Sequence, residues 1–275
     1  MNPGKFSISG NFLEHHGRTL FYILLEPTSV KALGSILFLP PFAEEMNKSR
    51  HIVASQARAL AEKGHRVMLL DLTGCGDAGG DFSDASWQIW LEDALVAADT
   101  LVKMGDEPLH LWGLRLGALL ACEVATERSD VEKLMLWQPV LNGEQQIDQF
   151  LRLRTVGTAV NSSGNFDRKT LWSELRAGRS LEIAGYEMSS SLALEMARSR
   201  LSDLKPTCRD IHWLEIGALA RDSLSVASEN VIANWEQQGV SLSKSAVLGD
   251  PFWRTVDAGI NFSLQHITTE AFAQP

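Results

Sequence analysis

Short apolar runs alternate with stretches of helical periodicity along most of this chain, and this alternation restricts the fold more than any other feature of the sequence. The apolar runs have the length and composition of strands buried on both faces, and they cover residues 35–39, 67–71, 109–112 and 131–137. The stretches between them place apolar residues at helical spacing, and they cover residues 49–63, 87–104 and 118–126. Strict alternation of this kind predicts an α/β fold with a parallel central sheet and helices on both of its faces.

The two ends of the chain extend this pattern. Residues 5–25 contain a loosely alternating segment and an apolar segment on either side of a polar stretch with Gly17, which is typical of an antiparallel β-hairpin. Near the other end the alternation resumes with two further strands and two further helices. We predict these strands at residues 211–216 and 240–248 and these helices at residues 223–238 and 262–272.

Residues 142–205 interrupt the alternation. This segment is rich in polar helix formers and shows no strand-like apolar run. We therefore predict a helical lid insertion at 142–205 in a core domain that is formed by residues 1–141 and 206–275.

The balance of charges excludes several classes of partner. A formal net charge of −9 leaves no basic excess for phosphates, and no stripe of lysine and arginine interleaves with aromatic residues, so nucleic acid is not a predicted partner. The apolar runs fall short of the ~20 residues that cross a bilayer, and residues 1–12 lack a signal-peptide pattern. We therefore expect a cytoplasmic protein without a membrane span.

The three cysteines are widely spaced and have no C-x-x-C pairing or nearby histidine cluster. This spacing predicts reduced thiols rather than a zinc site. We predict neither a metal nor a cofactor.

The segment from Leu109 to Ala118 combines a buried strand, the sequence Gly113-Leu114-Arg115-Leu116-Gly117 and an apolar helix. This is the pattern of a nucleophile elbow, with Arg115 at the position of the catalytic serine. The two glycines fit this interpretation, because a sharp strand-to-helix turn strains its central residue and leaves little room on either side.

With this elbow the chain resembles the α/β-hydrolase superfamily over nearly all of its length. Three segments, at residues 39–50, 112–118 and 251–253, are similar to the hydrolase-like proteins associated with the exosortase A system. The resemblance implies an α/β-hydrolase fold and an arginine at the elbow. It also implies a bacterial origin and a link to exopolysaccharide synthesis and protein sorting.

The residues that a serine hydrolase requires are not all present. Arg115 cannot act as a nucleophile, because its guanidinium stays protonated and has no usable lone pair. The resemblance places the catalytic histidine in the loop after the last strand, but residues 249–253 contain none. Of the other histidines, His212 lies at the wrong end of its strand and His266 far along the terminal helix. Only the acid has a candidate, Asp222, so we disfavour serine-triad chemistry.

Arg115 has two alternative interpretations. It could be packed in an abandoned pocket and neutralised by a carboxylate, for which Glu44 and Glu45 are the first candidates, followed by Asp222 and Asp71. Alternatively, it lies at a helix N-terminus that favours anions and binds a carboxylate or phosphate of a ligand. The residues that we expect to line such a site are Arg115, Leu116, Phe42, Ala43, Glu44, Glu45 and Trp253.

Two further residues could take part in chemistry. His51 begins a helix near the expected site and could act as a base, although a polar residue on a helix surface is the simpler interpretation. Cys75 lies in a glycine-rich loop beside the expected cleft, but nothing in the sequence supplies a base to activate its thiol.

The sequence leaves two hypotheses for function. The first is an esterase-like hydrolase or acyltransferase in which Glu44, Glu45 or His51 performs acid–base work. The second is a non-catalytic pseudoenzyme that binds an anionic glycan or lipid in an exosortase-linked pathway. A homodimer is a further prediction.

Overall fold

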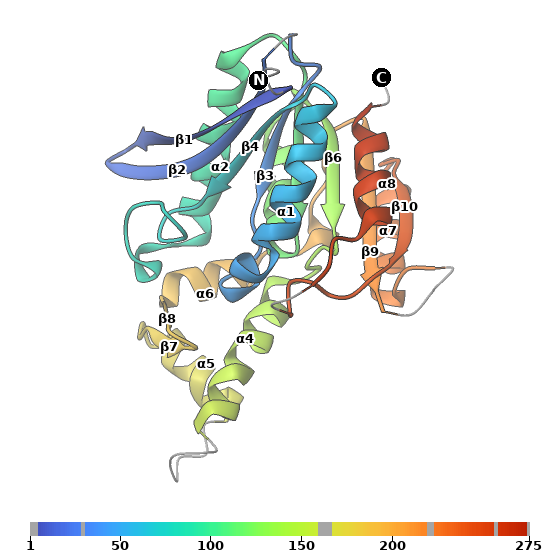
Figure 1. Cartoon of the computed structure of the whole chain (residues 1–275). Coiled ribbons are helices and arrows are strands. Elements are labelled where there is room, and N and C mark those ends of the chain that lie inside the picture. The colour runs from blue at the N-terminus through green and yellow to red at the C-terminus, as the bar shows by residue number, and fades with distance from the viewer. Residues whose placement is uncertain (1–4, 29–30, 159–166, 219–222, 256–257, 274–275) are drawn as a thin grey trace.

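The computed structural model describes residues 5–28, 31–158, 167–218, 223–255 and 258–273. Its main feature is an eight-stranded sheet in the order β1-β2-β4-β3-β5-β6-β9-β10 (Figure 1). The strands are β1 Phe6–His15, β2 Arg18–Pro27, β3 Ser35–Leu39, β4 Arg66–Asp71, β5 Leu109–Leu114, β6 Val131–Trp137, β9 Asp210–Gly217 and β10 Ser243–Leu248. From β4 to β10 all neighbours pair in parallel, whereas β1 and β2 pair antiparallel and β2 joins β4 antiparallel. The predicted parallel sheet with an N-terminal hairpin is confirmed.

The hairpin turn follows from two residues. His16 and Gly17 connect β1 to β2, and both have positive φ, at 48° and 77°. Positive φ at both central residues is the requirement of the two-residue turn whose twist matches that of the flanking strands.

Helices cover both faces of the sheet (Figure 1). Helices α1 Glu44–Glu62 and α8 Phe262–Ala273 pack on one face. The other face is covered by α2 Trp87–Met104, α3 Leu116–Glu127 and α7 Val226–Gln237. Side chains alternate along a strand. Leu111 of β5 therefore belongs to the hydrophobic core under α2, α3 and α7, whereas its neighbour Trp112 belongs to the core under α1 and α8. The fold is the α/β-hydrolase fold that the alternation and the elbow predict.

Some element boundaries differ from the prediction. Helix α1 begins at Glu44, five residues before the predicted start, and its two leading glutamates suit the positive end of a helix. Helix α7 begins at Val226, where the Ser225 side chain accepts a hydrogen bond from the Ser228 N–H. Strand β10 begins at Ser243 rather than at 240.

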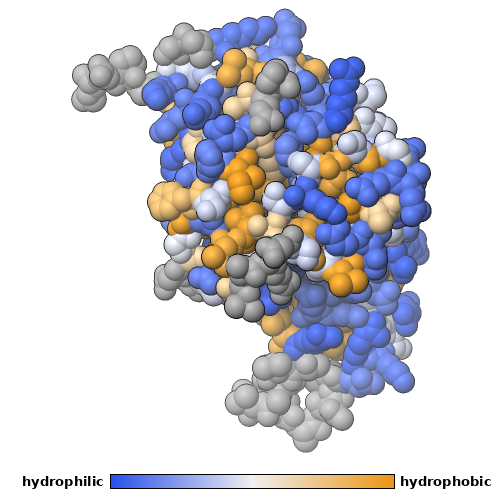
Figure 2. Space-filling view, turned by 90° about the vertical axis from the view of Figure 1, so that its right-hand side faces the viewer, coloured by the Kyte–Doolittle hydropathy of each residue, from blue (hydrophilic) through white to orange (hydrophobic). Residues whose placement is uncertain are grey.

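The side of the molecule formed by α7, β10 and α8 carries hydrophobic residues among hydrophilic ones (Figure 2). The large apolar side chains that are most exposed on these three elements are Val226, Leu248 and Phe262. No helix in the described ranges is both long and apolar enough to cross a membrane.

The insertion lies beyond the edge of the sheet at which the parallel strands end (Figure 1). It contains α4 Gly143–Thr158, α5 Arg168–Arg176 and α6 Ser190–Met196, but also a small hairpin of β7 Leu181–Ile183 and β8 Tyr186–Met188. The expectation of a purely helical insertion was therefore incomplete. Strands of three residues are too short to show an alternating pattern in the sequence.

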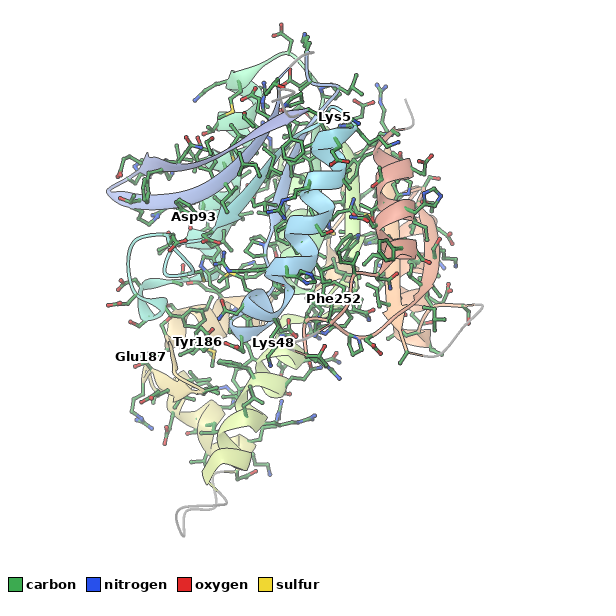
Figure 3. All side chains as sticks on the ribbon, in the orientation of Figure 1. Lys5, Lys48, Asp93, Tyr186, Glu187 and Phe252 are labelled. Atoms are coloured by element: carbon green, nitrogen blue, oxygen red, sulfur yellow. The ribbon has the colours of Figure 1, made fainter. Side chains whose placement is uncertain are left out.

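The β7–β8 hairpin contacts the core through Tyr186, which points toward the beginning of α1 near Lys48 (Figure 3). The Tyr186 hydroxyl donates to Glu44 Oε2 at 3.2 Å and accepts from Asn47 Nδ2 at 3.3 Å. Burial, together with the charge of Glu44, raises the pKa of Tyr186 to about 12. The tyrosine therefore remains a neutral hydrogen-bond donor at physiological pH.

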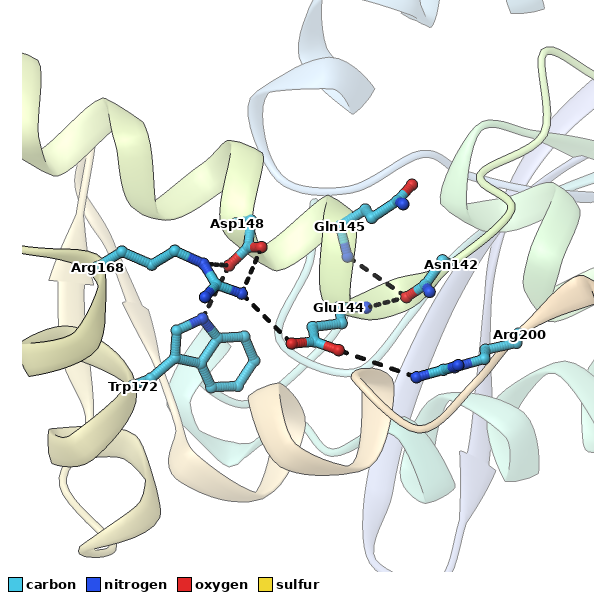
Figure 4. A network of polar contacts seen from close by, with 7 residues as sticks. All are labelled: Asn142, Glu144, Gln145, Asp148, Arg168, Trp172 and Arg200. Atoms are coloured by element: carbon cyan, nitrogen blue, oxygen red, sulfur yellow. Dashed lines mark hydrogen bonds and ion pairs between the residues drawn. The ribbon is translucent and has the colours of Figure 1, made fainter. Parts of the chain in front are cut away.

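A polar network fixes α4 at its beginning and against α5 (Figure 4). Asn142 Oδ1 accepts the N–H of Glu144 at 2.9 Å, as an N-terminal cap does. One turn further on, Asp148 accepts two bonds of 2.7 Å from Arg168 and one of 2.8 Å from the Trp172 indole. Helix α4 is thus anchored on the side away from the sheet, and its other side faces the elbow.

Candidate functional site

The turn from β5 to α3, with Arg115 at its centre, has the backbone conformation of a nucleophile elbow. Arg115 has φ 56° and ψ −115°, a region that L-residues rarely adopt and that costs about 1–3 kcal/mol. A side chain at Gly113 would overlap the backbone of Gly117, and one at Gly117 would overlap the carbonyl of Leu39. The two glycines are therefore required by close backbone approaches on both sides of Arg115.

Hydrogen bonds to neighbouring elements hold the elbow in place. The Arg115 N–H donates to the Trp137 carbonyl at 2.9 Å, and the Val140 N–H donates to the Arg115 carbonyl at 3.1 Å. Leu116 is the first residue of α3, so its N–H has no acceptor within the helix. Ala43, just before α1, has a similarly strained backbone with φ 50° and ψ −127°. Both loops that would form an oxyanion hole thus retain their special geometry.

The Arg115 guanidinium is buried beneath α4 and contacts three side chains. Its Nε and Nη2 both donate to Glu45 Oε1 at 3.3 Å, and Nη2 also donates to Gln146 Oε1 at 3.2 Å. Its Cζ lies 5.5 Å from the ring centroid of Trp253, in the range of a cation–π contact. Of the predicted carboxylate partners, the structure selects Glu45.

Two of the other candidate carboxylates, Glu44 and Asp71, are engaged elsewhere. Glu44 accepts the hydroxyl of Tyr186, and Asp71 forms an ion pair of 3.3 Å with Arg50. Asp222, the candidate acid, lies outside the described residues.

The pairing of Arg115 with Glu45 is incomplete. A bidentate pair uses both carboxylate oxygens at 2.7–2.9 Å. Here one oxygen accepts both bonds, and the other, Oε2, is buried and has no hydrogen-bond partner among the described residues. Burial raises the pKa of Glu45, and the charges of Arg115 and Arg254 partly oppose this rise. In the part of the chain that the structure describes, Arg115 Nη1 makes no hydrogen bond. Two of the five guanidinium donors are therefore available.

The loop that follows β10 packs aromatic residues against the elbow. Trp253 stacks over Arg115, and Phe252 lies 5.1 Å from Trp253 and 6.1 Å from Trp137 between ring centroids. Phe252 and Trp253 are both nearly fully buried. The indole of Trp253 therefore covers one side of the elbow residue.

The histidines lie away from the elbow. His51 is exposed on α1, which agrees with the simpler interpretation of this residue as a polar side chain on a helix surface. His212, at the beginning of β9, contacts Ser243 Oγ at 2.6 Å and Asp210 at 3.0 Å. His65 and His110 are buried side by side, with ring centroids 6.3 Å apart, at the opposite end of the strands.

Cys75 has the environment of an inactive thiol. Burial, reinforced by the charges of Asp71 and Asp93, raises its pKa to about 12. Since the thiolate is the nucleophile, this residue is a poor candidate for covalent chemistry.

Three cavities lie around the elbow. One of about 300 Å³ is lined by Arg115, Gln138, Glu215, Ser225, Trp253 and Arg254, among others. A second, of about 160 Å³, shares Arg115 and Glu215 with it and extends toward α4. The third, of about 470 Å³, lies between α1 and α4 and is lined by Glu45, Lys48, Phe150 and Arg254 among others. The predicted residues Phe42, Ala43, Glu44, Glu45 and Trp253 line this third cavity.

On the α2 side of the elbow, aromatic rings leave almost no space. Phe42 lies 5.7 Å from Phe82, 6.0 Å from Trp90 and 4.9 Å from Phe150 between centroids. The remaining cavity, which Leu116 lines, measures about 10 Å³. An extended acyl chain does not fit on this side.

The sequence did not point to three residues of this site. Gln146 comes from the insertion, and only the three-dimensional fold brings it to Arg115. Arg254 follows Trp253 directly, but no motif in the sequence marks it as a site residue. Glu215 carried a signal, since it is a charged residue in an otherwise apolar run that was predicted to be a buried strand.

Solved structures share this fold. Est1E from Butyrivibrio proteoclasticus matches with a TM-score of 0.66 and 17% identity over 96% of this chain and 99% of that chain. A hypothetical protein from Pseudomonas aeruginosa has the same TM-score, with 14% identity over 98% of this chain and 94% of that one. An α/β hydrolase from Penicillium sp. sh18 gives 0.64 with 16% identity, over 97% and 98%. At these identities the likeness concerns the fold alone.

The sequence comparisons define the family. No curated protein is similar enough to match this chain. The family model described as serine aminopeptidase, S33, matches residues 31–208, which is well over half of the chain and includes the elbow. The chain therefore belongs to the S33 serine aminopeptidase family of α/β-hydrolases.

Proposed function

We propose that this protein binds a carboxylate or phosphate group at Arg115 and has lost the serine-type hydrolysis of its family. The observation that carries the proposal is the incomplete pairing of a buried guanidinium. Arg115 Nη1 has no hydrogen-bond partner among the described residues, and Arg115 lines two cavities. Its position at the beginning of α3 adds N–H groups and the positive end of a helix, which favour an anion.

The surroundings of Arg115 favour a polar ligand over one with a long acyl chain. The cavities on the α4 and β9 sides include Gln138, Gln146 and Arg254, whereas the α2 side is filled with aromatic rings. The resemblance to exosortase-associated proteins makes an anionic glycan, or the headgroup of a lipid intermediate, the class that we infer.

Calorimetry with acetate, succinate, phosphate and glucuronate tests this proposal. We expect at least one anion to bind the wild type and to bind Arg115→Gln at least tenfold more weakly, since a charge-assisted hydrogen bond contributes about 1.5–3 kcal/mol. Arg58→Gln, an exposed residue on α1, is the matched control and should bind as the wild type does. Equal affinities in wild type and Arg115→Gln would reject the proposal.

Residual hydrolysis is the second candidate. The family match, the strained backbone of Arg115 and Ala43, and the raised pKa of Glu45 favour it. A panel of acyl esters and thioesters is the test: turnover above background that Glu45→Gln abolishes would support it. Absence of turnover in the wild type, with Arg115→Ser no worse, would count against it.

The homodimer stays a prediction. The exposed Val226, Leu248 and Phe262 on one side of the molecule are the apolar groups available for such a contact. Light scattering of wild type and Phe262→Ser over a range of concentrations would test it.

A further inference from the structure

The cavity of about 300 Å³ lies where the α/β-hydrolase fold places the side chains of its histidine and acid. Its walls come from the elbow, from the end of β9 and from the loop after β10. Residues 249–253 contain no histidine, and Trp253 stacks on the guanidinium instead of filling this space. Pockets that bind small molecules typically begin at about 300 Å³, so the cavity suits a compact ligand.

One wall of this cavity carries a buried carboxylate that forms no ion pair with any of the described residues. Glu215 is only 9% exposed. It accepts the Ser225 N–H at 2.8 Å, the Ser225 hydroxyl at 3.0 Å and the Ser228 hydroxyl. All three donors are neutral, and no lysine, arginine or histidine among the described residues forms an ion pair with Glu215.

The three hydrogen bonds that Glu215 accepts hold its carboxylate in place but leave it able to accept a further bond from a ligand. They tie the carboxylate to the beginning of α7, where the helix stabilises a negative charge. A carboxylate has about four acceptor sites, so at least one remains beyond these three bonds. A buried charge without a partner is costly, and a cation brought by a ligand would offset that cost.

The other walls of the same cavity carry positive charge. Arg115 and Arg254 both line it, and Arg115 Nη1 has no partner among the described residues. Positive and negative groups thus share one small space. A ligand that is only anionic would be attracted by Arg115 and repelled by Glu215, whereas a ligand with charges of both signs would satisfy both walls.

We propose, on the basis of the anion binding assigned above to Arg115, that this cavity binds a small zwitterion with its carboxylate at Arg115 and its ammonium group at Glu215. Glu215, rather than Glu45, is assigned the ammonium group because Glu45 already has Arg115 as an ion-pair partner and experiences the charge of Arg254.

The test compares acids that differ only by an amino group. Wild-type protein is titrated calorimetrically with β-alanine against propionate, 4-aminobutyrate against butyrate and 5-aminopentanoate against pentanoate. We expect the aminated acid to bind at least tenfold more tightly in at least one of these pairs. This comparison uses only the wild type, so it does not depend on the folding of any variant. Equal binding within every pair would overturn the zwitterion proposal.

Two variants locate the ammonium group. Glu215→Gln should abolish the preference for the aminated acid and leave the affinity for the plain acid equal or higher. Glu45→Gln is the matched control, in which both affinities rise together and their ratio is unchanged. A preference that survives Glu215→Gln but disappears in Glu45→Gln would also overturn the assignment.

The two proposals fail in different ways. If plain acids bind in an Arg115-dependent manner but the amino group makes no difference, only the zwitterion inference fails. If no acid of either kind binds, or if Arg115→Gln leaves every affinity unchanged, the anion site itself is wrong.

Discussion

The indole of Trp253 lies over the guanidinium of Arg115, with 5.5 Å between Cζ and the ring centroid. In a serine hydrolase the residues at these two places are expected to be the histidine and its serine. The elbow and the last loop are in contact through an aromatic–cation pair. Neither side chain of this pair can act as a nucleophile or a base, and the pair holds a fixed positive charge.

Removing the indole should weaken the fold. Trp253 is 4% exposed and contacts Phe252, so Trp253→Ala is expected to cost about 3–5 kcal/mol of unfolding free energy. Trp253→Phe keeps an aromatic face and should cost clearly less. Urea unfolding followed by far-UV circular dichroism measures both. Equal losses in the two variants would mean that the aromatic face above Arg115 contributes nothing.

Replacing Arg115 by serine should make stability depend on pH through Glu45. Burial already raises the pKa of Glu45 in the folded protein, and loss of the Arg115 charge raises it further. A carboxyl whose folded pKa is raised contributes stability below its unfolded pKa, and this contribution is lost as pH rises through the folded pKa. The melting temperature of Arg115→Ser, compared with that of the wild type at the same pH, should therefore fall as pH rises from 4.5 to 8. The double variant with Glu45→Gln should show no such slope, and a slope that persists in it would contradict this assignment.

The sequence was sufficient for the fold because the signals of the fold are local. A buried strand such as β5 is a continuous apolar run, and Gly113 and Gly117 mark the elbow by their spacing. The hairpin β7–β8 escaped prediction because each of its strands has three residues, which is too short for any periodicity to appear.

The site was predicted less completely than the fold because it depends on contacts over long sequence separations. The partner of Arg115 was narrowed to a few carboxylates, but the choice of Glu45 and the addition of Gln146 depend on how α1 and α4 converge. The same holds for the packing of Trp253 on Arg115. No sequence pattern states which of several charged residues will face one another across a cavity.

The thiols should be unreactive in the folded protein. Burial raises the pKa of Cys75 and of Cys208 to about 12 and that of Cys122 well above its ordinary value. We expect negligible reaction with a disulfide reagent at pH 8 in native protein and three equivalents in urea, since all three cysteines are free. Rapid reaction of one thiol in the native state, lost in Cys75→Ser, would restore Cys75 as a candidate nucleophile.

The buried pair His65 and His110 should make the protein sensitive to acid. Burial lowers the pKa of His65 to about 4 and that of His110 to about 3, and the nearby charge of Lys133 adds to both effects while Asp210 opposes it at His110. In the unfolded chain both histidines titrate near pH 6.5, so the unfolded state binds more protons than the folded state below that pH. The free energy of unfolding should therefore be highest above pH 6.5 and fall as pH decreases toward 4, by up to about 1.4 kcal/mol per pH unit for each histidine.

Urea unfolding of wild type and His110→Gln at pH 7.5, 6 and 5 measures this slope. His266→Gln, which changes an exposed histidine on α8, is the control and should keep the slope of the wild type. If His110→Gln has the same slope as the wild type, the acid sensitivity does not come from this histidine.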